Sequence, residues 1–352
     1  MWVEFRRKHL RFIYVPVINF LRYPLSSFRT RRYIKKIVKN FIQELNTSKA
    51  SRIRIIYNFA DSPHTFGDFM ITAMLGRFLA LSGHQLVLTA VDSTRRSDWE
   101  DLDKNIQDER IGELLDLAKY LLPESAKVEL VKNYLPMSSD VNLDSKSFYA
   151  AAPYFLDLLI TKYKWPLPDS FLLRVGTSDT SEPYIAWHVR KATYDSRRNL
   201  TSSSVQNDFE TLKKKFPDHS IMLISDSAGL EDAFLALTGS RKTEARILRG
   251  VRILPQPVPG FQNAIPAVLG ASFYFQRGGG GIGIAPMFSS IPYLNLCADK
   301  THYINLCVNK THFNEWSGNR ILPWSTENQL FVYAKENVKS FPIQRLINRL
   351  KV

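Results

Sequence analysis

A short segment of the sequence combines residue types that bind phosphate groups. The run Ile185-Ala-Trp-His-Val-Arg190 reads as an apolar strand that ends in His188 and Arg190, two residues apart. Side chains two apart in a strand share a face, so both donors would emerge together. Arginine binds phosphate oxygens through paired, charge-assisted hydrogen bonds, and the following loop adds Arg198 and Asn199. His188 alone would suggest a core histidine, but the basic cluster after it favours a phosphate or diphosphate site.

A second polar pair, Ser225 and Asp226, follows the apolar strand 221–224 and leads into a predicted helix. Asp226 is a good N-cap residue for that helix. At the carboxyl end of a parallel strand the same carboxylate can also bond a ribose hydroxyl or a base edge. The two interpretations are compatible, and both remain open.

A third segment is rich in glycine and lies between an apolar strand and a predicted helix at 284–289. In the run Gln276-Arg-Gly-Gly-Gly-Gly-Ile-Gly283, the four consecutive glycines are Gly278, Gly279, Gly280 and Gly281. Such a loop lets backbone amides approach an anion closely, although a flexible turn is the alternative. The spacing matches neither the dinucleotide-binding fingerprint nor a P-loop.

Alternating strands and helices are predicted to position these loops. The first set has strands at 52–59 and 85–91 and helices at 69–82, 107–122 and 146–163, while 123–145 is unassigned. The second set has strands at 184–189, 220–225, 251–254, 272–275 and 293–296, with helices at 204–216, 228–238 and 261–270. This alternation predicts an α/β chain with two Rossmann-like, doubly wound domains of parallel strands.

The predicted division has four parts. A basic amphipathic N-terminal extension, residues 1–50, precedes an N-terminal Rossmann-like domain at 51–170. A stretch with Pro and Ser at 166–183 serves as the linker. A C-terminal Rossmann-like domain follows at 171–335, and a C-terminal helix at 336–352. Two such domains in series are expected to bind a ligand in the cleft between them.

The three loops together resemble the fucosyltransferase-like superfamily of glycosyltransferases, which have the two-domain GT-B fold. There, a His-x-Arg at a strand end, a Ser/Thr-Asp loop and a small-residue loop hold the nucleotide diphosphate. The resemblance spans about residues 184–297. It implies that Arg190 binds donor phosphate, that His188 supports this site and that Asp226 lies near the nucleoside.

The run Arg190-Lys-Ala-Thr-Tyr-Asp-Ser-Arg-Arg-Asn199 is also similar to a loop of bacterial surface-carbohydrate glycosyltransferases, in which Arg-Asn follows the strand motif. Two features differ from the fucosyltransferase-like pattern. Arg-Lys-Ala-Thr replaces the familiar Arg-Arg-Gly-Asp, and four glycines replace a Ser-rich loop. The resemblance therefore implies a nucleotide-sugar donor without limiting it to GDP-fucose.

The loop Asp61-Ser-Pro-His-Thr-Phe-Gly-Asp68 follows the first strand and would face the donor across a GT-B cleft. An inverting transfer needs a base that deprotonates the acceptor hydroxyl, and Asp61, His64 and Asp68 are the candidates. Asp68 is equally well explained as the cap or first-turn acid of the next helix. A retaining transfer would need no dedicated base.

No metal or further cofactor is expected. The single Asp-x-Asp, Asp101-Leu-Asp103, lies in an acidic stretch that does not follow a buried strand. A ten-residue tandem repeat at 293–312 places Cys297, His302, Cys307 and His312 five residues apart. Duplication explains that spacing, and the close-set ligand pairs of structural zinc sites are missing.

The net charge of +14 is concentrated at the N-terminus, where residues 1–42 hold eleven Lys/Arg and one acid, Glu4. Aromatic residues, from Trp2 to Phe41, are interleaved with these charges, a composition suited to an anionic membrane surface. The longest apolar run, 12–21, contains Pro16 and is shorter than the roughly 20 residues that span a bilayer. Alternatively, the segment is a solvated extension, or forms helices packed on the catalytic body.

The sequence carries no zinc-finger, RNA-binding or basic-zipper signature, so a nucleic-acid partner is not expected. Two cysteines and no leader with a cleavage site favour the cytosol, with the protein peripheral on the inner face of the membrane. The predicted function is a metal-independent glycosyltransferase that moves a sugar from a nucleotide donor to a glycan or lipid-linked acceptor during surface polysaccharide synthesis. The alternative is a catalytically silent α/β binding protein recruited to membranes.

Overall fold

The structure is a computed structural model, and the statements below concern the residues it describes. These are 31–47, 52–62, 65–92, 104–136, 139–148, 151–174, 182–189, 200–256, 261–277, 281–297, 323–333, 343–348 and 350.

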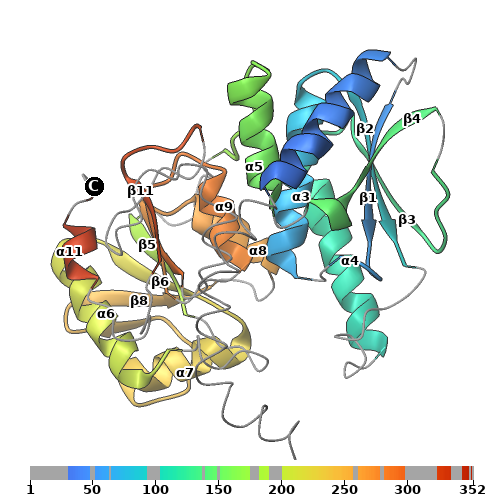
Figure 1. Cartoon of the computed structure of the whole chain (residues 1–352). Helices are drawn as coiled ribbons and strands as arrows, with labels where there is room; N and C mark the ends of the chain where they lie inside the picture. The colour runs from blue at the N-terminus through green and yellow to red at the C-terminus, as the bar shows by residue number, and fades with distance from the viewer. Residues whose placement is uncertain are drawn as a thin grey trace, which may run out of the picture.

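The N-terminal sheet has four parallel strands in the order β3-β2-β1-β4. They are β1 (Arg52–Asn58), β2 (Gln85–Val91), β3 (Lys127–Val131) and β4 (Asp140–Asp144). Helices α3 (Phe66–Leu81) and α4 (Lys104–Leu121) connect them, and α5 (Ala152–Asp157) continues into a π-helical turn, Leu158–Lys162. Figure 1 shows these helices, with a further helix at 31–47, on one side of the sheet.

The C-terminal sheet has seven strands in the order β11-β10-β9-β5-β6-β8-β7. They are β5 (Tyr184–His188), β6 (Ser220–Ile224), β7 (Arg246–Leu248), β8 (Val251–Pro255), β9 (Phe273–Arg277), β10 (Tyr293–Cys297) and β11 (Gln329–Tyr333). Only β7 is antiparallel to its neighbour among the described strands. Without β7 this is the doubly wound Rossmann order, in which the direction of winding reverses between β5 and β9.

The helices of the C-terminal half divide between the two faces of this sheet. They are α6 (Ser202–Lys215), α7 (Ser227–Thr238), α8 (Phe261–Leu269), α9 (Ile284–Met287) and α11 (Gln344–Ile347), with a 3-10 turn at Gly281–Gly283 before α9. Phe273 and Phe275 of β9 point into the core under α6 and α7, whereas Tyr274 between them belongs to the other core. The strand is therefore buried on both faces, as parallel strands usually are.

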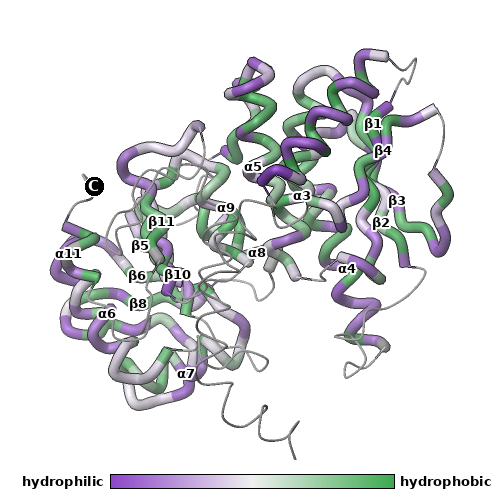
Figure 2. The backbone as a smooth tube through the Cα atoms, viewed as in Figure 1, coloured by the Kyte–Doolittle hydropathy of each residue, from purple (hydrophilic) through white to green (hydrophobic). Residues whose placement is uncertain are grey.

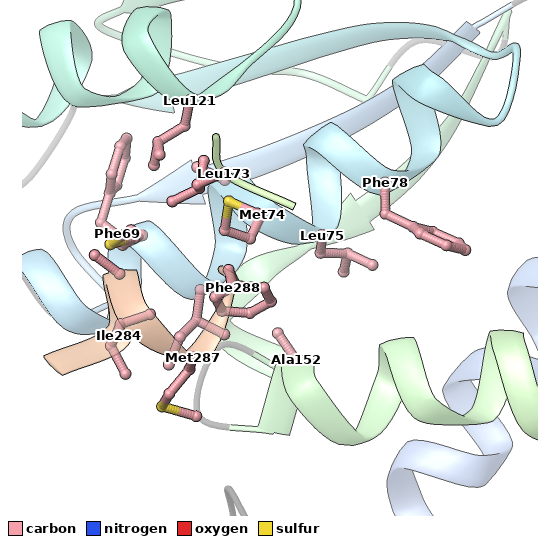
Figure 3. Close-up of a cluster of buried hydrophobic side chains, with 14 of the residues drawn as sticks. Phe69, Met74, Leu75, Phe78, Leu121, Ala152, Leu173, Ile284, Met287 and Phe288 are labelled. Atoms are coloured by element: carbon pink, nitrogen blue, oxygen red, sulfur yellow. The ribbon is translucent and has the colours of Figure 1, made fainter. Parts of the chain in front are cut away.

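One hydrophobic core is continuous between the two sheets. It combines the inner face of β1 and β2 and the helices α3 to α5 with α8, α9 and the facing side of β9. In Figure 3, Phe69 and Met74 of α3 lie beside Ile284, Met287 and Phe288 of the C-terminal half. The two halves are thus joined through packed apolar side chains.

The predicted α/β fold with two parallel-sheet domains is confirmed, with differences in detail. Strand 85–91 has the predicted bounds, whereas the predicted helix 146–163 is divided into a 3-10 turn (Ser145–Ser147), α5 and the π turn. Strands β3, β4, β7 and β11 were not predicted. The predicted strand 272–275 extends to Arg277, and within the described part of 336–352 the helix covers Gln344–Ile347.

Candidate functional site

The two halves meet where the loop after β1 approaches the turn after β9. Gly67, in the first turn of α3, lies against Gly281: a Cβ built on Gly67 would be 3.2 Å from the Cα of Gly281 and 3.8 Å from Cγ1 of Ile284. Any side chain at Gly67 would push the two backbones apart. Carboxyl-end loops of both sheets are therefore in contact, at the place where doubly wound sheets bind ligands.

The predicted phosphate loop follows β5, which pairs with β9, the strand before this turn. His188 ends β5 and lies opposite Gln276 of β9 on one side and Ile224 of β6 on the other. The side chain of His188 is half-buried. The predicted donor ligands Arg190, Arg198 and Asn199, and the glycines Gly278, Gly279 and Gly280, lie outside the described residues. The strands before these two loops, β5 and β9, are hydrogen-bonded neighbours, and the direction of winding reverses between them.

Ser225 and Asp226 fix the ends of two neighbouring strands. Asp226 is the N-cap of α7, and its Oδ1 accepts a hydrogen bond from the Gly229 amide at 2.7 Å. The Ser225 hydroxyl donates to the Val189 carbonyl at 2.6 Å, which ties the end of β6 to the end of β5. A Cβ on Gly229 would lie 1.9 Å from Ser225 Oγ, so this turn requires glycine. The capping interpretation of Asp226 is confirmed, and its contact with a nucleoside stays a prediction.

The turn at 281–283 rests on buried amide side chains. A Cβ on Gly283 would lie 2.2 Å from Gln276 Oε1 and 2.7 Å from Asn295 Nδ2, so only glycine fits above them. Gln276 also accepts a hydrogen bond from the hydroxyl of Tyr274, whose pKa is raised well above its usual value by burial. Gln276 and Asn295 are polar residues inside largely apolar strands, and this pattern could have indicated that they support the turn. The pattern was not recognised from the sequence.

Arg277 is the last residue of β9, directly before the glycine loop, and it does not point into that loop. Its guanidinium forms a bidentate, buried ion pair with Asp208 of α6, in which Nε donates to Oδ2 at 2.7 Å and Nη2 donates to Oδ1. Burial raises the pKa of Asp208, and the charge and hydrogen bonds of Arg277 oppose this shift. The placement of Gln276 and Arg277 in the glycine loop was therefore wrong, because both are buried strand residues.

Asp61 lies at the carboxyl ends of β1 and β4, within a cluster of charged side chains. The Lys146 ammonium is 3.8 Å from the Asp61 carboxylate and 3.1 Å from that of Asp144. The pKa of Lys146 is raised by these carboxylates, Asp144 having the larger effect. Beneath them, the buried hydroxyls of Ser62 and Ser145 share a hydrogen bond of 2.8 Å. Sequence reasoning did not identify Asp144, Ser145 or Lys146.

Asp68 lies in the first turn of α3, next to Gly67. The helix cap is Thr65, whose Oγ1 accepts from the Asp68 amide at 3.3 Å. The same hydroxyl donates to Asp68 Oδ2 at 2.6 Å, which orients the carboxylate. Asp68 is thus the first-turn acid and not the cap. His64, the third candidate base, lies outside the described residues.

Within the described part of the chain, no group of three or more His, Cys, Asp or Glu side chains could hold a metal ion. Asp101, Asp103 and most of the tandem repeat lie outside that part, so the expectation of a metal-free site stays a prediction.

No protein-family model matches the sequence, and no curated protein matches it either. The chain is distantly similar to the solved Escherichia coli ADP-heptose lipopolysaccharide heptosyltransferase II, with 11% identity, a TM-score of 0.43, and 85% of this chain and 97% of that one covered. It is also similar to a family 9 glycosyl transferase from Veillonella parvula, with 9% identity, a TM-score of 0.37, and 87% and 92% covered. These similarities are too low to assign a family or an activity.

Proposed function

We propose that the protein is a glycosyltransferase that moves a sugar from a nucleotide-activated donor to a hydroxyl of a glycan or lipid-linked acceptor. The observation that supports this most directly is the contact between Gly67 and Gly281. It brings the segment that carries the candidate bases next to the turn at 281–283, at the end of the glycine loop. A transferase needs this proximity, because the acceptor hydroxyl and the departing diphosphate flank one carbon atom.

The donor diphosphate is proposed to bind between the ends of β5 and β9. Arg190 follows β5 by two residues, and Gly278, Gly279 and Gly280 follow β9 directly. The bond from Ser225 to the Val189 carbonyl and the ion pair of Arg277 with Asp208 hold the adjoining strand ends. Arg190 and the backbone amides of the glycine loop then stabilise the charge that develops on the leaving diphosphate. The proposed transfer uses no metal.

Asp68 is the proposed base. It follows Gly67 in the chain, its carboxylate is oriented by the Thr65 hydroxyl, and it is more enclosed than Asp61, whose side chain is 47% exposed beside Lys146. As the acceptor oxygen attacks the anomeric carbon, its proton passes to Asp68. The bond from that carbon to the diphosphate oxygen breaks, and the configuration at the anomeric carbon is inverted. Asp61 then serves as the matched comparison, because it is a carboxylate seven residues earlier, in the segment that joins β1 to α3.

The donor site is tested by a thermal-shift screen with GDP, UDP, CDP, ADP, dTDP, CMP and NAD(H). A ligand that binds the native state raises its stability by mass action, about 2.7 kcal/mol at a concentration 100 times its Kd. We expect one nucleoside diphosphate to stabilise the protein and Arg190→Ala to abolish the shift. A shift with NAD(H) alone would overturn the proposal, and equal nucleotide binding by Arg190→Ala would refute the site.

The chemistry is tested by transfer of labelled sugar from the donor that the screen identifies to extracted lipid acceptors. Asp68→Asn is expected to lower kcat by about 10²- to 10⁴-fold, since a positioned general base contributes that much. Its nucleotide binding should be unchanged. Asp61→Asn should retain most of the activity, and the opposite ranking of these two variants would assign the base to Asp61. Nucleotide binding without any transfer by the wild-type chain would instead indicate a silent binding protein.

A further inference from the structure

The helix at 31–47 is the part of the basic N-terminal segment that the structure describes. Its apolar side is buried in the core and consists of Ile34, Val38 and Phe41, with exposed fractions of 1%, 0% and 3%. The ring of Phe41 contacts Phe155 of α5 at 5.7 Å and Trp165 at 6.5 Å. This helix packs on the body, so Phe41 is not available for acyl chains.

The opposite side of the helix carries four exposed cations, Arg32, Lys35, Lys36 and Lys39, which we call the basic face. Their spacing of three, four and seven residues places them on one stripe of the helix. Figure 2 shows hydrophilic and hydrophobic residues alternating along this helix, as expected if one side is packed and the other is solvated. Because the packed side is fixed, the direction of the basic face is fixed as well.

The basic face has no counter-charge within the part of the chain that the structure describes. None of its four side chains forms an ion pair with any described residue, and Glu44 is the sole acid of the helix. Like charges at these spacings repel and destabilise a helix. The contacts of the described residues therefore do not account for this cluster, and an anionic surface outside the chain would relieve the repulsion.

We propose that the basic face binds an anionic membrane surface and holds the N-terminal half of the protein against it. A bilayer fits because a single convex helix can contact an extended plane of lipid phosphates through all four cations at once. Tyr33, 52% exposed among these cations, has the amphipathic ring that is enriched at membrane–water interfaces. The preceding residues 1–30 add six Lys/Arg against one acid, so the positive charge continues along the chain.

This mode of binding is electrostatic and does not require insertion. Among the described residues, no helix is both long and apolar enough to cross a bilayer. The helix lies along α5, on the N-terminal half and away from α6 and α7 (Figure 1). A protein bound in this way would present the N-terminal half, which carries Asp61 and Asp68, nearest to the lipid surface. The inference does not depend on the proposed transferase activity.

The test is cosedimentation of the full chain with phosphatidylcholine vesicles that contain or lack phosphatidylglycerol. The four-site variant R32Q/K35Q/K36Q/K39Q removes the basic face, and K132Q/K213Q/K214Q/K242Q removes the same charge from exposed or partly exposed sites elsewhere. Deleting the helix is unsuitable, since that would uncover the core around Ile34, Val38 and Phe41. Thermal unfolding of both variants checks that the fold is kept.

We expect wild type to bind only the anionic vesicles and to be released at high salt, where the Debye length falls from about 10 Å to about 3 Å. The four-site variant should bind them about a thousandfold more weakly, since each cation near an anionic surface contributes about 1 kcal/mol and every 1.4 kcal/mol is tenfold. The control variant should bind nearly as well as wild type. Equal losses in both variants, or no loss in the four-site variant, would overturn the proposal. Binding of duplex DNA or RNA in preference to vesicles would also overturn it, in favour of a nucleic-acid partner.

Discussion

Arg54 and Arg277 are both buried arginines paired with carboxylates, one in each sheet, and they differ in where they sit along their strands. Arg54 lies in the middle of β1, and its Nε donates to Asp140 of β4 at 2.7 Å. Arg277 is the last residue of β9, where it pairs with Asp208 of α6. A buried Arg–Asp ion pair therefore lies within the N-terminal sheet, whereas in the C-terminal sheet a similar pair lies at the strand ends beside the candidate site.

Arg54 closes a sheet face on which the structure places no described helix. Its Nη1 donates to Thr89 of β2 at 2.6 Å and to Glu129 of β3, so Arg54 of β1, with Asp140 of β4, links all four strands of the sheet. The ring of Tyr134 lies over it, 5.7 Å from centroid to Cζ. Parallel sheets usually have helices on both faces. Here hydrogen bonds between side chains cover the outer face instead, far from the carboxyl-end loops.

Arg277 stabilises a different arrangement, because it joins the end of β9 to the helix that follows the predicted phosphate loop. Asp208 has no other cation partner among the described residues, whereas Asp140 also accepts from Arg52 at 3.1 Å. Loss of Arg277 leaves an isolated buried carboxylate beside the site. Loss of Arg54 leaves a carboxylate that is still paired.

The largest effect is expected for Arg277→Met. Removing one partner of a buried ion pair typically costs about 3–5 kcal/mol of unfolding free energy, because the remaining charge is uncompensated. We also expect at least a tenfold loss of nucleoside diphosphate affinity, of about 1.4 kcal/mol, since the glycine loop begins directly after this residue. Urea unfolding and titration calorimetry measure the two quantities.

The double variant Arg277→Met/Asp208→Leu is the control for Arg277→Met. It removes the stranded carboxylate, so most of the stability should return, while nucleotide affinity should stay low. Full recovery of both quantities would mean that the ion pair does not position the loop.

Arg54→Met should destabilise the protein by a smaller amount, about 2–3 kcal/mol, because Arg52 still pairs with Asp140 and Lys127 with Glu129. Its affinity for nucleoside diphosphate should equal that of wild type when both are measured well below their unfolding midpoints. A loss of affinity comparable to that of Arg277→Met would remove the distinction between the two arginines.

The sequence predicted the strands that are buried on both faces more successfully than those with a polar face. Runs such as 85–91 and 220–224 are mostly apolar, and both were placed to within a residue. Strands β3 and β4 read KVELV and DVNLD, since their outward side chains belong to the ionic face around Arg54. Their pattern therefore resembled a polar connection.

The candidate site was predicted as a set of strand ends, and the contacts that support it were not predicted. The positions of His188 and Ser225 follow from the ends of apolar runs. Arg277 was placed in a loop because it is charged and precedes glycine, but its partner Asp208 is 69 residues away. A pair so distant along the chain leaves no local pattern in one sequence. Gly67 and Gly281 likewise reveal their contact only when the two sheets are assembled.

The smallest expected effect is a difference between the two ion pairs in how their contribution to the unfolding free energy depends on pH. Burial acts to raise the pKa of Asp140, but hydrogen bonds and charge from Arg54 and Arg52 hold it below its ordinary value of 3.8. Asp140 therefore contributes stability that is present above that value and is lost as the pH falls through its folded-state pKa. The pKa of Asp208 is raised above 3.8, mainly by burial. In the folded protein Asp208 therefore takes up its proton at a higher pH than in the unfolded chain, so its contribution to stability increases as the pH falls towards 3.8.

Asp140→Asn and Asp208→Asn isolate these two contributions, because each removes one titration and keeps the size of the side chain. The difference in unfolding free energy between wild type and Asp140→Asn should shrink at acid pH, whereas that for Asp208→Asn should grow between neutral pH and 3.8. A tenfold change in the proton affinity of either carboxylate on folding corresponds to about 1.4 kcal/mol of unfolding free energy. Urea unfolding across this range measures both slopes. Slopes of the same sign would show that the two ion pairs, despite their different places in the sheets, hold their carboxylates in equivalent environments.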